Sequence, residues 1–149
     1  MRPGLPRFLF TCGLALAAAT AGAQTLPEVV MHKDPNCGCC AKWARHLEAN
    51  GFRVRSVDEI DMEAVKRRFA VPPRLTSCHT ARVGGYVIEG HVPASAIRRL
   101  LREKPALAGL SAPGMPAGSP GMEVPGEREA YDVVSFDEAG RSRVFERFR

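Results

Sequence analysis

The most reactive side chains of this sequence are the thiols of four of its five cysteines. Three of them, Cys37, Cys39 and Cys40, stand close together, and Cys78 follows further along the chain. The turn residues 34–36 before them are typical of a helix start, where free amides and the positive end of the helix dipole lower thiol pKa values. Thiolates act as nucleophiles and as ligands for soft metal ions. The cluster therefore predicts redox chemistry or a metal site.

The redox interpretation uses Cys37 and Cys40, whose C-x-x-C spacing is that of thiol–disulfide oxidoreductases. The additional thiol of Cys39 would compete with this pair for the disulfide. Two structural disulfides are a simpler alternative for an exported protein. These cysteines are clustered, however, whereas structural disulfides stabilise most when they close long loops.

The metal interpretation uses all four cysteines. Successive helical residues point about 100° apart, so Cys37 and Cys40 share a face and Cys39 points elsewhere. With Cys78, this spread favours several ions held by bridging thiolates. Soft sulfur donors select Cu(I), zinc or iron–sulfur clusters, and zinc is less expected because paired C-x-x-C motifs are missing. Neighbouring thioethers and imidazoles favour copper. The candidates for a secondary metal site, or for residues that contact and support the cysteine ligands, are Met115, Met122, His79 and His91.

Each of these candidates also has a purely structural interpretation. Methionines commonly fill gaps over a core, and Met115 and Met122 lie in a Gly- and Pro-rich loop. If Cys78 lies on a strand, alternation points His79 to the opposite face. His91 stands just before a predicted helix and would serve there as a cap.

The pattern around the cysteines predicts alternating strands and helices. Strands are expected at 28–33, 52–57, 75–83 and 86–90, with a closing hairpin at 131–136 and 143–148. Helices are expected at 37–50, 61–69 and 93–105, and residues 109–126 are expected to form a loop without regular structure. The order β-α-β-α-β-β-α predicts one α/β, thioredoxin-like domain with a mixed central sheet, flanking helices and a C-terminal β-hairpin.

The N-terminal residues 1–23 predict a secretory signal peptide. Two arginines precede an apolar run, residues 8–19, which is too short to span a bilayer. Ala21-Gly22-Ala23 then matches the small-x-small pattern of a cleavage site. We therefore expect a single domain at 24–149 that is exported and does not insert into the membrane after cleavage.

Composition excludes several classes of protein. Charged residues make up 25% and hydrophobic residues 45% of the 149 positions, which is close to the globular average and unlike disordered or fibrous chains. The 21 Lys and Arg residues outnumber the 16 Asp and Glu residues, but they are interleaved with acids. Basic runs such as 66–68 and 98–99 are therefore expected to be solvated faces, and nucleic acid is not an expected partner.

Longer stretches of the sequence resemble the exported CopG-like copper-resistance proteins, a family long carried as a domain of unknown function. The resemblance covers nearly all of the chain from about Val29 to the last hairpin. One departure is Ala70, where the family pattern has glycine. The matching stretches are Cys37-Gly38-Cys39-Cys40 with Trp43, Val71-Pro72-Pro73, residues 77–81, residues 85–94, Gly109-Leu110, residues 113–116 and residues 118–123.

The resemblance implies a thioredoxin-like fold, a periplasmic location and a role in copper resistance or handling. It further implies a copper–thiolate cluster, with several Cu(I) ions held by Cys37, Cys39, Cys40 and Cys78. The expected partners are copper ions and other periplasmic copper-handling proteins. A redox role is compatible with the site, so the sequence also fits a copper- or thiol-dependent oxidoreductase.

Overall fold

The computed structural model describes residues 25–149, and the predicted signal peptide at 1–23 lies outside the described residues. The strands are β1 (Val29–Lys33), β2 (Val54–Asp58), β3 (Thr80–Val83), β4 (Tyr86–Gly90), β5 (Gly109–Ala112), β6 (Tyr131–Phe136) and β7 (Ser142–Phe148). The helices are α1 (Gly38–Ala49), α2 (Met62–Arg68) and α3 (Ala94–Glu103), with one 3₁₀ turn, η1 (Pro73–Leu75). The mixed α/β class predicted from the sequence is confirmed.

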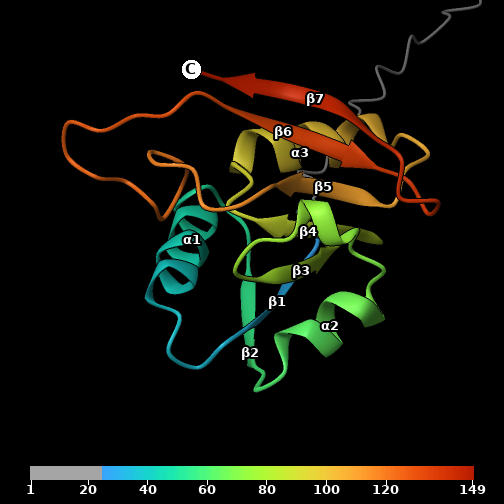
Figure 1. Cartoon of the computed structure of the whole chain (residues 1–149), viewed down its shortest axis with the longest axis horizontal. Helices are drawn as coiled ribbons and strands as arrows, with labels where there is room; N and C mark the ends of the chain where they lie inside the picture. Colours follow the sequence, from blue (N-terminus) through green and yellow to red (C-terminus); the bar gives the residue numbers. More distant parts are fainter. Residues whose placement is uncertain (1–24) are drawn as a thin grey trace, which may run out of the picture.

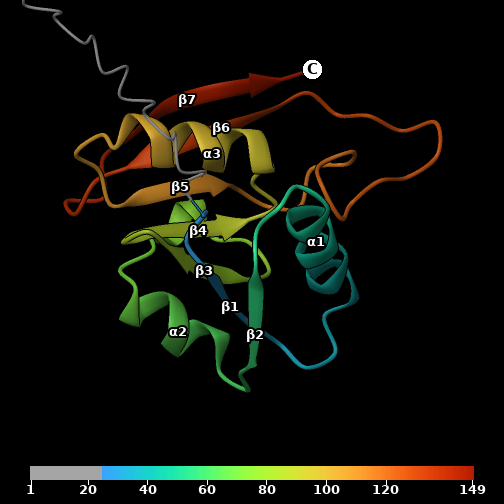
Figure 2. The same cartoon turned by 180° about the vertical axis from the view of Figure 1, so that it is seen from behind.

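The seven strands form a single mixed sheet in the order β2-β1-β3-β4-β5-β6-β7 (Figure 1). The pairs β1–β2 and β4–β5 are parallel, and the other neighbouring pairs are antiparallel. Seen from behind, α3 lies in front of β5 and β6 (Figure 2). Across residues 25–149, no helix is both long enough and apolar enough to cross a membrane.

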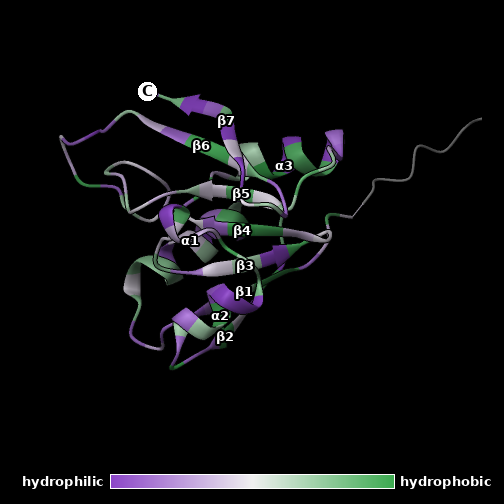
Figure 3. Ribbon diagram, turned by 45° about the vertical axis from the view of Figure 1, so that its right-hand side comes forward, coloured by the Kyte–Doolittle hydropathy of each residue, from purple (hydrophilic) through white to green (hydrophobic). Residues whose placement is uncertain are grey.

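The main core is formed by inward-facing strand residues together with α1 and α3. Trp43 and Leu47 of α1 and Ile97 of α3 are fully buried in one cluster with Ile88 of β4. Because side chains alternate along a strand, Glu89 faces the opposite side of β4, where it meets Lys66 of α2. Much of β4 is hydrophobic in Figure 3, whereas β7 at the sheet edge is largely hydrophilic.

Two parts of the predicted strand pattern are wrong. The segment 75–83 is not one strand, because Pro73 begins a 3₁₀ turn and a bend follows before β3 starts at Thr80. Residues 109–112, predicted to be loop, form the interior strand β5 between β4 and β6, and all four of its residues are buried. A Cβ atom at Gly109 would collide with the carbonyl of Val87, so this close strand pairing requires glycine.

Ala70 occupies the left-handed region of backbone space, with φ at +52°. It follows α2, and its amide donates to the Arg67 carbonyl at 3.1 Å, which closes the helix end. A side chain makes this conformation unfavourable by about 1–2 kcal/mol, whereas glycine adopts it readily. The position where this sequence departs from the glycine of the family pattern is therefore one where the backbone itself favours glycine.

Candidate metal centre

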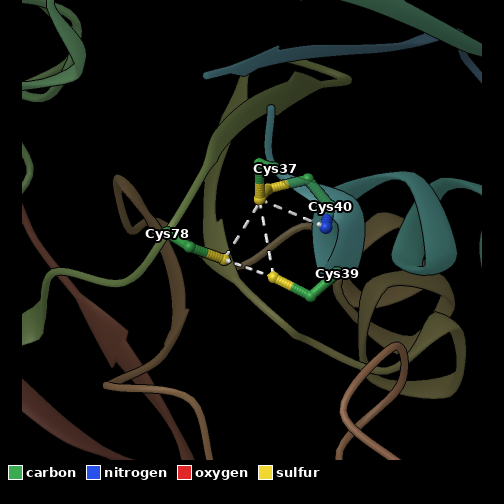
Figure 4. A group of neighbouring side chains, drawn as sticks. All are labelled: Cys37, Cys39, Cys40 and Cys78. Atoms are coloured by element: carbon green, nitrogen blue, oxygen red, sulfur yellow. Dashed lines mark hydrogen bonds between the residues drawn. A yellow bond between two sulfur atoms is a disulfide. The ribbon is translucent and has the colours of Figure 1, made fainter. Parts of the chain in front are cut away.

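The four cysteine sulfurs lie together at the N-terminal end of α1 (Figure 4). The Sγ atom of Cys39 is 3.5 Å from that of Cys37 and 3.8 Å from that of Cys78, and Cys40 Sγ is also 3.8 Å from Cys78 Sγ. All four sulfurs lie within 4.8 Å of one another. The fold thus brings together the four cysteines selected from the sequence.

Cys37 and Cys40 form a disulfide, with their Cα atoms 5.4 Å apart, while Cys39 and Cys78 are free thiols. The C-x-x-C pair is therefore oxidised in this structure. The two remaining thiols lie close enough to this pair that all four sulfurs form one continuous group.

A tight turn places the first three cysteines at the start of α1. The Asp34 side chain accepts a hydrogen bond from the Asn36 amide at 2.8 Å, and its carbonyl accepts one from the Cys37 amide at 3.0 Å. Cys37 is the N-cap residue, and its sulfur accepts from the Cys40 amide at 3.3 Å. The free amides and the positive end of the α1 dipole thus lie beside these sulfurs.

A buried ion pair holds the segment that carries Cys78. Glu89 is fully buried and accepts from Lys66 Nζ at 2.7 Å, from the Ser77 amide at 2.7 Å and from Thr80 Oγ1 at 2.6 Å. Two of these donors stand on either side of Cys78 in the sequence. Burial raises the pKa of Glu89, and the charge of Lys66 opposes this shift. The network therefore fixes the bend that points Cys78 at the helix start.

Sequence reasoning missed this network and assigned Lys66 to a solvated face. The prediction for Lys66 is wrong, since its side chain is buried against Glu89. The available signal was Glu89 itself, a lone carboxylate in the apolar strand β4. A charge in such a strand requires a buried partner, although nothing in the local pattern identifies Lys66 as that partner.

The sulfur of Cys78 also contacts two histidines. His79 Nδ1 lies 3.3 Å away and His91 Nε2 lies 3.0 Å away. The expectation that His79 points away from Cys78 is wrong, because Cys78 lies in the bend before β3 and alternation does not extend through it. Both histidines are fully buried, and the ring of His79 packs on Trp43 with centroids 4.4 Å apart.

Burial controls the protonation of this group. It raises the pKa of the Cys78 thiol to about 12, with the neighbouring Cys39 adding to the shift. Burial also lowers the pKa of His91, and it lowers that of His79 well below the ordinary value. Without a metal ion, Cys78 is therefore a neutral thiol beside two neutral imidazoles, and a bound cation would have to displace the thiol proton.

The Gly- and Pro-rich loop covers this site at Gly121. A Cβ atom there would lie 2.8 Å from the Cys39 carbonyl and 3.3 Å from His91 Nδ1, and the φ of +88° also favours glycine. Of the two methionines in the loop, Met115 is exposed and Met122 is half-buried. Metal ligation by Met115 or Met122 stays a prediction.

Comparison with known proteins identifies related chains. Residues 75–122 match a family described as a protein of unknown function, DUF411. No curated protein matches the chain. Two solved structures, named copper resistance protein CopG in form 1 and form 2, are each 47% identical to it and cover 83% of it. The match extends over 98% and 99% of those chains, with TM-scores of 0.78 and 0.79.

The similarity thus extends over most of both chains. Nearly half of the aligned residues are identical, which is far above the level at which only a fold is shared. The resemblance found in the sequence is confirmed: the chain belongs to the family of the copper resistance protein CopG.

Proposed function

We propose that this protein binds Cu(I) in copper resistance or copper handling and that Cys37, Cys39, Cys40 and Cys78 are the ligands. The observation that carries this proposal is the gathering of four sulfurs within 4.8 Å from two segments far apart in the sequence. Thiolates are soft donors that prefer Cu(I). The names of the two similar structures, both copper resistance proteins, support the same metal.

Several copper ions, bridged by shared thiolates, suit this group better than one ion. Cys78 Sγ lies 3.8 Å from the sulfurs of both Cys39 and Cys40, and Cys39 also contacts Cys37 at 3.5 Å. A sulfur with two sulfur neighbours is placed to bridge two ions. The paired C-x-x-C motifs typical of a closed zinc site are missing from the sequence, which makes zinc the weaker candidate.

Copper loading requires the reduced form of the site. Each Cu(I)–thiolate bond needs a deprotonated sulfur, and the Cys37–Cys40 disulfide withholds two of the four ligands. Reduction of this disulfide consumes two electrons and two protons and restores both thiols. Copper loading and cysteine oxidation should therefore exclude one another, so the redox state of Cys37 and Cys40 should control copper binding.

A second candidate function is thiol–disulfide exchange through Cys37 and Cys40. The observation that favours it is the disulfide between these residues at the first strand-to-helix junction. The element order β-α-β-α-β-β-α supports a thioredoxin-like fold, which suits this chemistry as well as metal binding. In this alternative, copper would bind only incidentally.

The variant Cys39→Ser separates the two functions. A bridged copper cluster loses a ligand, so we expect Cu(I) binding measured against a chromophoric Cu(I) chelator to weaken by more than about tenfold. Reduction of a protein disulfide through Cys37 and Cys40 should continue at the parental rate. Cys37→Ser is the matched control, because it should abolish both properties. Full Cu(I) binding by Cys39→Ser would favour the oxidoreductase.

We propose a periplasmic location on the basis of the signal peptide predicted at residues 1–23. The mature chain should begin at or near Gln24, and other periplasmic copper-handling proteins are its proposed partners. The intact mass of protein recovered from the periplasm checks this proposal. We expect the mass of a chain that lacks residues 1–23 and begins at or near Gln24. A mass that includes Met1 would contradict it.

A further inference from the structure

We propose that His46 is a pH-sensitive clamp between α1 and the start of α3, closed when its ring is neutral and open when the ring is protonated. The Nε2 atom of His46 accepts a hydrogen bond from the Ala94 amide at 3.1 Å. His46 lies in the C-terminal half of α1, and Ala94 is the first residue of α3, which begins beside that half of α1 (Figure 2). His46 is not part of the cysteine group, so this inference does not depend on copper binding.

Helix α3 has no N-terminal cap of its own. The first amides of a helix have no partner within the helix, and the side chain of the N-cap residue usually accepts from one of them. The N-cap residue of α3 is Pro93, which makes no such hydrogen bond. Ala94 is buried, so its amide needs a partner within the protein. His46 therefore supplies, from another helix, the acceptor that α3 lacks.

A second hydrogen bond connects the same two parts of the fold. Trp43 Nε1 donates to the Val92 carbonyl at 2.9 Å, just before α3. Trp43 and His46 stand three residues apart on α1 and therefore lie on the same side of the helix. The indole N–H is a donor only, whereas a histidine changes its charge between about pH 5 and pH 8. Of these two connections, only that of His46 can respond to pH.

Protonation of His46 removes the acceptor. A neutral imidazole has one acceptor nitrogen, whereas both nitrogens of an imidazolium are donors. A proton on Nε2 would face the Ala94 N–H, and its charge would lie at the positive end of the α3 dipole. Burial lowers the pKa of His46 from its ordinary value, which agrees with a position that favours the neutral ring.

Glu123 supplies a counter-charge for the open state. This residue of the Gly- and Pro-rich loop accepts from the Gly121 amide at 3.0 Å. Its negative charge favours the protonated ring and opposes the lowering of the pKa of His46. Neutral His46 thus bonds α3, and protonated His46 is attracted to the loop, which gives the clamp two states with different contacts.

The other groups around His46 do not stabilise a protonated ring. On α1, Lys42 stands one helical turn before His46. On α3, the first turn carries no acidic residue, and Arg98 donates to the carbonyl of Asn50, one turn after His46. In the segment before α3, burial lowers the pKa of His91, which keeps that ring neutral. The closed state is therefore favoured from both helices, and Glu123 alone favours the open one.

The clamp makes the stability of the protein depend on pH in a defined window. The ordinary histidine pKa of 6.5 applies to the unfolded chain, and the pKa of His46 in the fold is lower. The contribution of the clamp is thus complete above pH 6.5 and is lost as the pH falls from there through the lower pKa. One proton changes the equilibrium constant for unfolding by at most about tenfold per pH unit in this window.

NMR titration of the unmodified protein tests the clamp without any risk to folding. The probe is the proton, varied between about pH 8 and pH 5 on ¹⁵N-labelled, copper-free protein with its disulfide intact. We expect the ring nitrogens of His46 to titrate with a midpoint below 6.5 and the Ala94 amide to shift with the same midpoint. The Lys104 amide, which donates to the Leu100 carbonyl at the other end of α3, is the internal control and should not follow this transition.

Two variants test the direction of each effect. Glu123→Gln removes the charge that favours the protonated ring, so the midpoint of His46 should move to lower pH, whereas the control Glu127→Gln in the same loop should not move it. His46→Gln keeps an acceptor oxygen but does not bind a proton in this range. Between about pH 7 and pH 5, its unfolding constant should therefore rise less than that of the parent, measured by urea unfolding.

Three outcomes would overturn the clamp. The first is a His46 midpoint at or above 6.5, and the second is an Ala94 amide that does not follow the His46 titration. The third is a His46→Gln protein whose unfolding keeps the full pH dependence of the parent. The remaining histidines are present in both proteins, so their own contributions cancel in this comparison.

Discussion

Cys78→Ser is expected to weaken Cu(I) binding as severely as Cys37→Ser, although the two cysteines lie far apart in the sequence. Cys78 Sγ lies 3.8 Å from the sulfurs of both Cys39 and Cys40, so this one substitution removes a ligand that neighbours two others in the proposed cluster. A serine hydroxyl is a hard donor that binds Cu(I) poorly. We expect the affinity for Cu(I) to fall by more than about 100-fold, because 100-fold is the upper end of the range for removing a residue that only supports a metal ligand.

The measurement is competition for Cu(I) against a chromophoric chelator, with both variants reduced and handled anaerobically. Urea unfolding followed by the fluorescence of Trp43, the single tryptophan, serves as a control for folding. Unchanged affinity and copper content in Cys78→Ser, with a marked loss in Cys37→Ser, would show that Cys78 is not a ligand. The cluster would then be limited to the helix start.

Glu89→Ala is expected to lower the free energy of unfolding by about 3–5 kcal/mol, the range for breaking a buried ion pair by removing one partner. The substitution leaves the charge of Lys66 buried without its carboxylate and removes the acceptor of the Ser77 amide and the Thr80 hydroxyl. Because these donors flank Cys78, weaker copper binding should accompany the loss of stability.

Glu103→Ala is the matched control for this variant. Glu103 pairs with Arg99 at 2.9 Å one helical turn away, and both side chains are partly exposed to solvent. Such pairs contribute about 0.2–1 kcal/mol, so urea denaturation should give nearly parental stability. Equal effects of the two substitutions would contradict the role of Glu89 as the buried anchor of the Cys78 segment.

The elements nearest the three clustered cysteines could be predicted because local patterns determine them. The helix expected at 37–50 forms as α1 at Gly38–Ala49, since its apolar residues recur at helical spacing and turn residues precede it. The strand expected at 86–90 forms as β4. Strand β5 could not be predicted in this way, because Gly109–Ala112 is short and buried throughout and has no alternation of polar and apolar residues.

The convergence of His79 and His91 on Cys78 could not be predicted either. It depends on a bend at Cys78 that interrupts strand alternation, and this bend depends on Glu89 from a neighbouring strand. The pairing of Lys66 with Glu89 is likewise a tertiary contact between α2 and β4. Residue types and local spacing identified the ligand candidates, whereas the surrounding buried network depends on the fold.

The most direct test of the central claim compares Cu(I) binding by the reduced and the oxidised protein, using the chain that begins at Gln24. Thiol counting should find Cys39 and Cys78 free in the aerobically isolated protein, and all four cysteines free after reduction. We predict that the reduced protein binds several Cu(I) ions and that the oxidised protein binds far less, because the Cys37–Cys40 disulfide withholds two ligands. Oxidised protein that binds Cu(I) as fully as reduced protein would contradict the four-cysteine cluster.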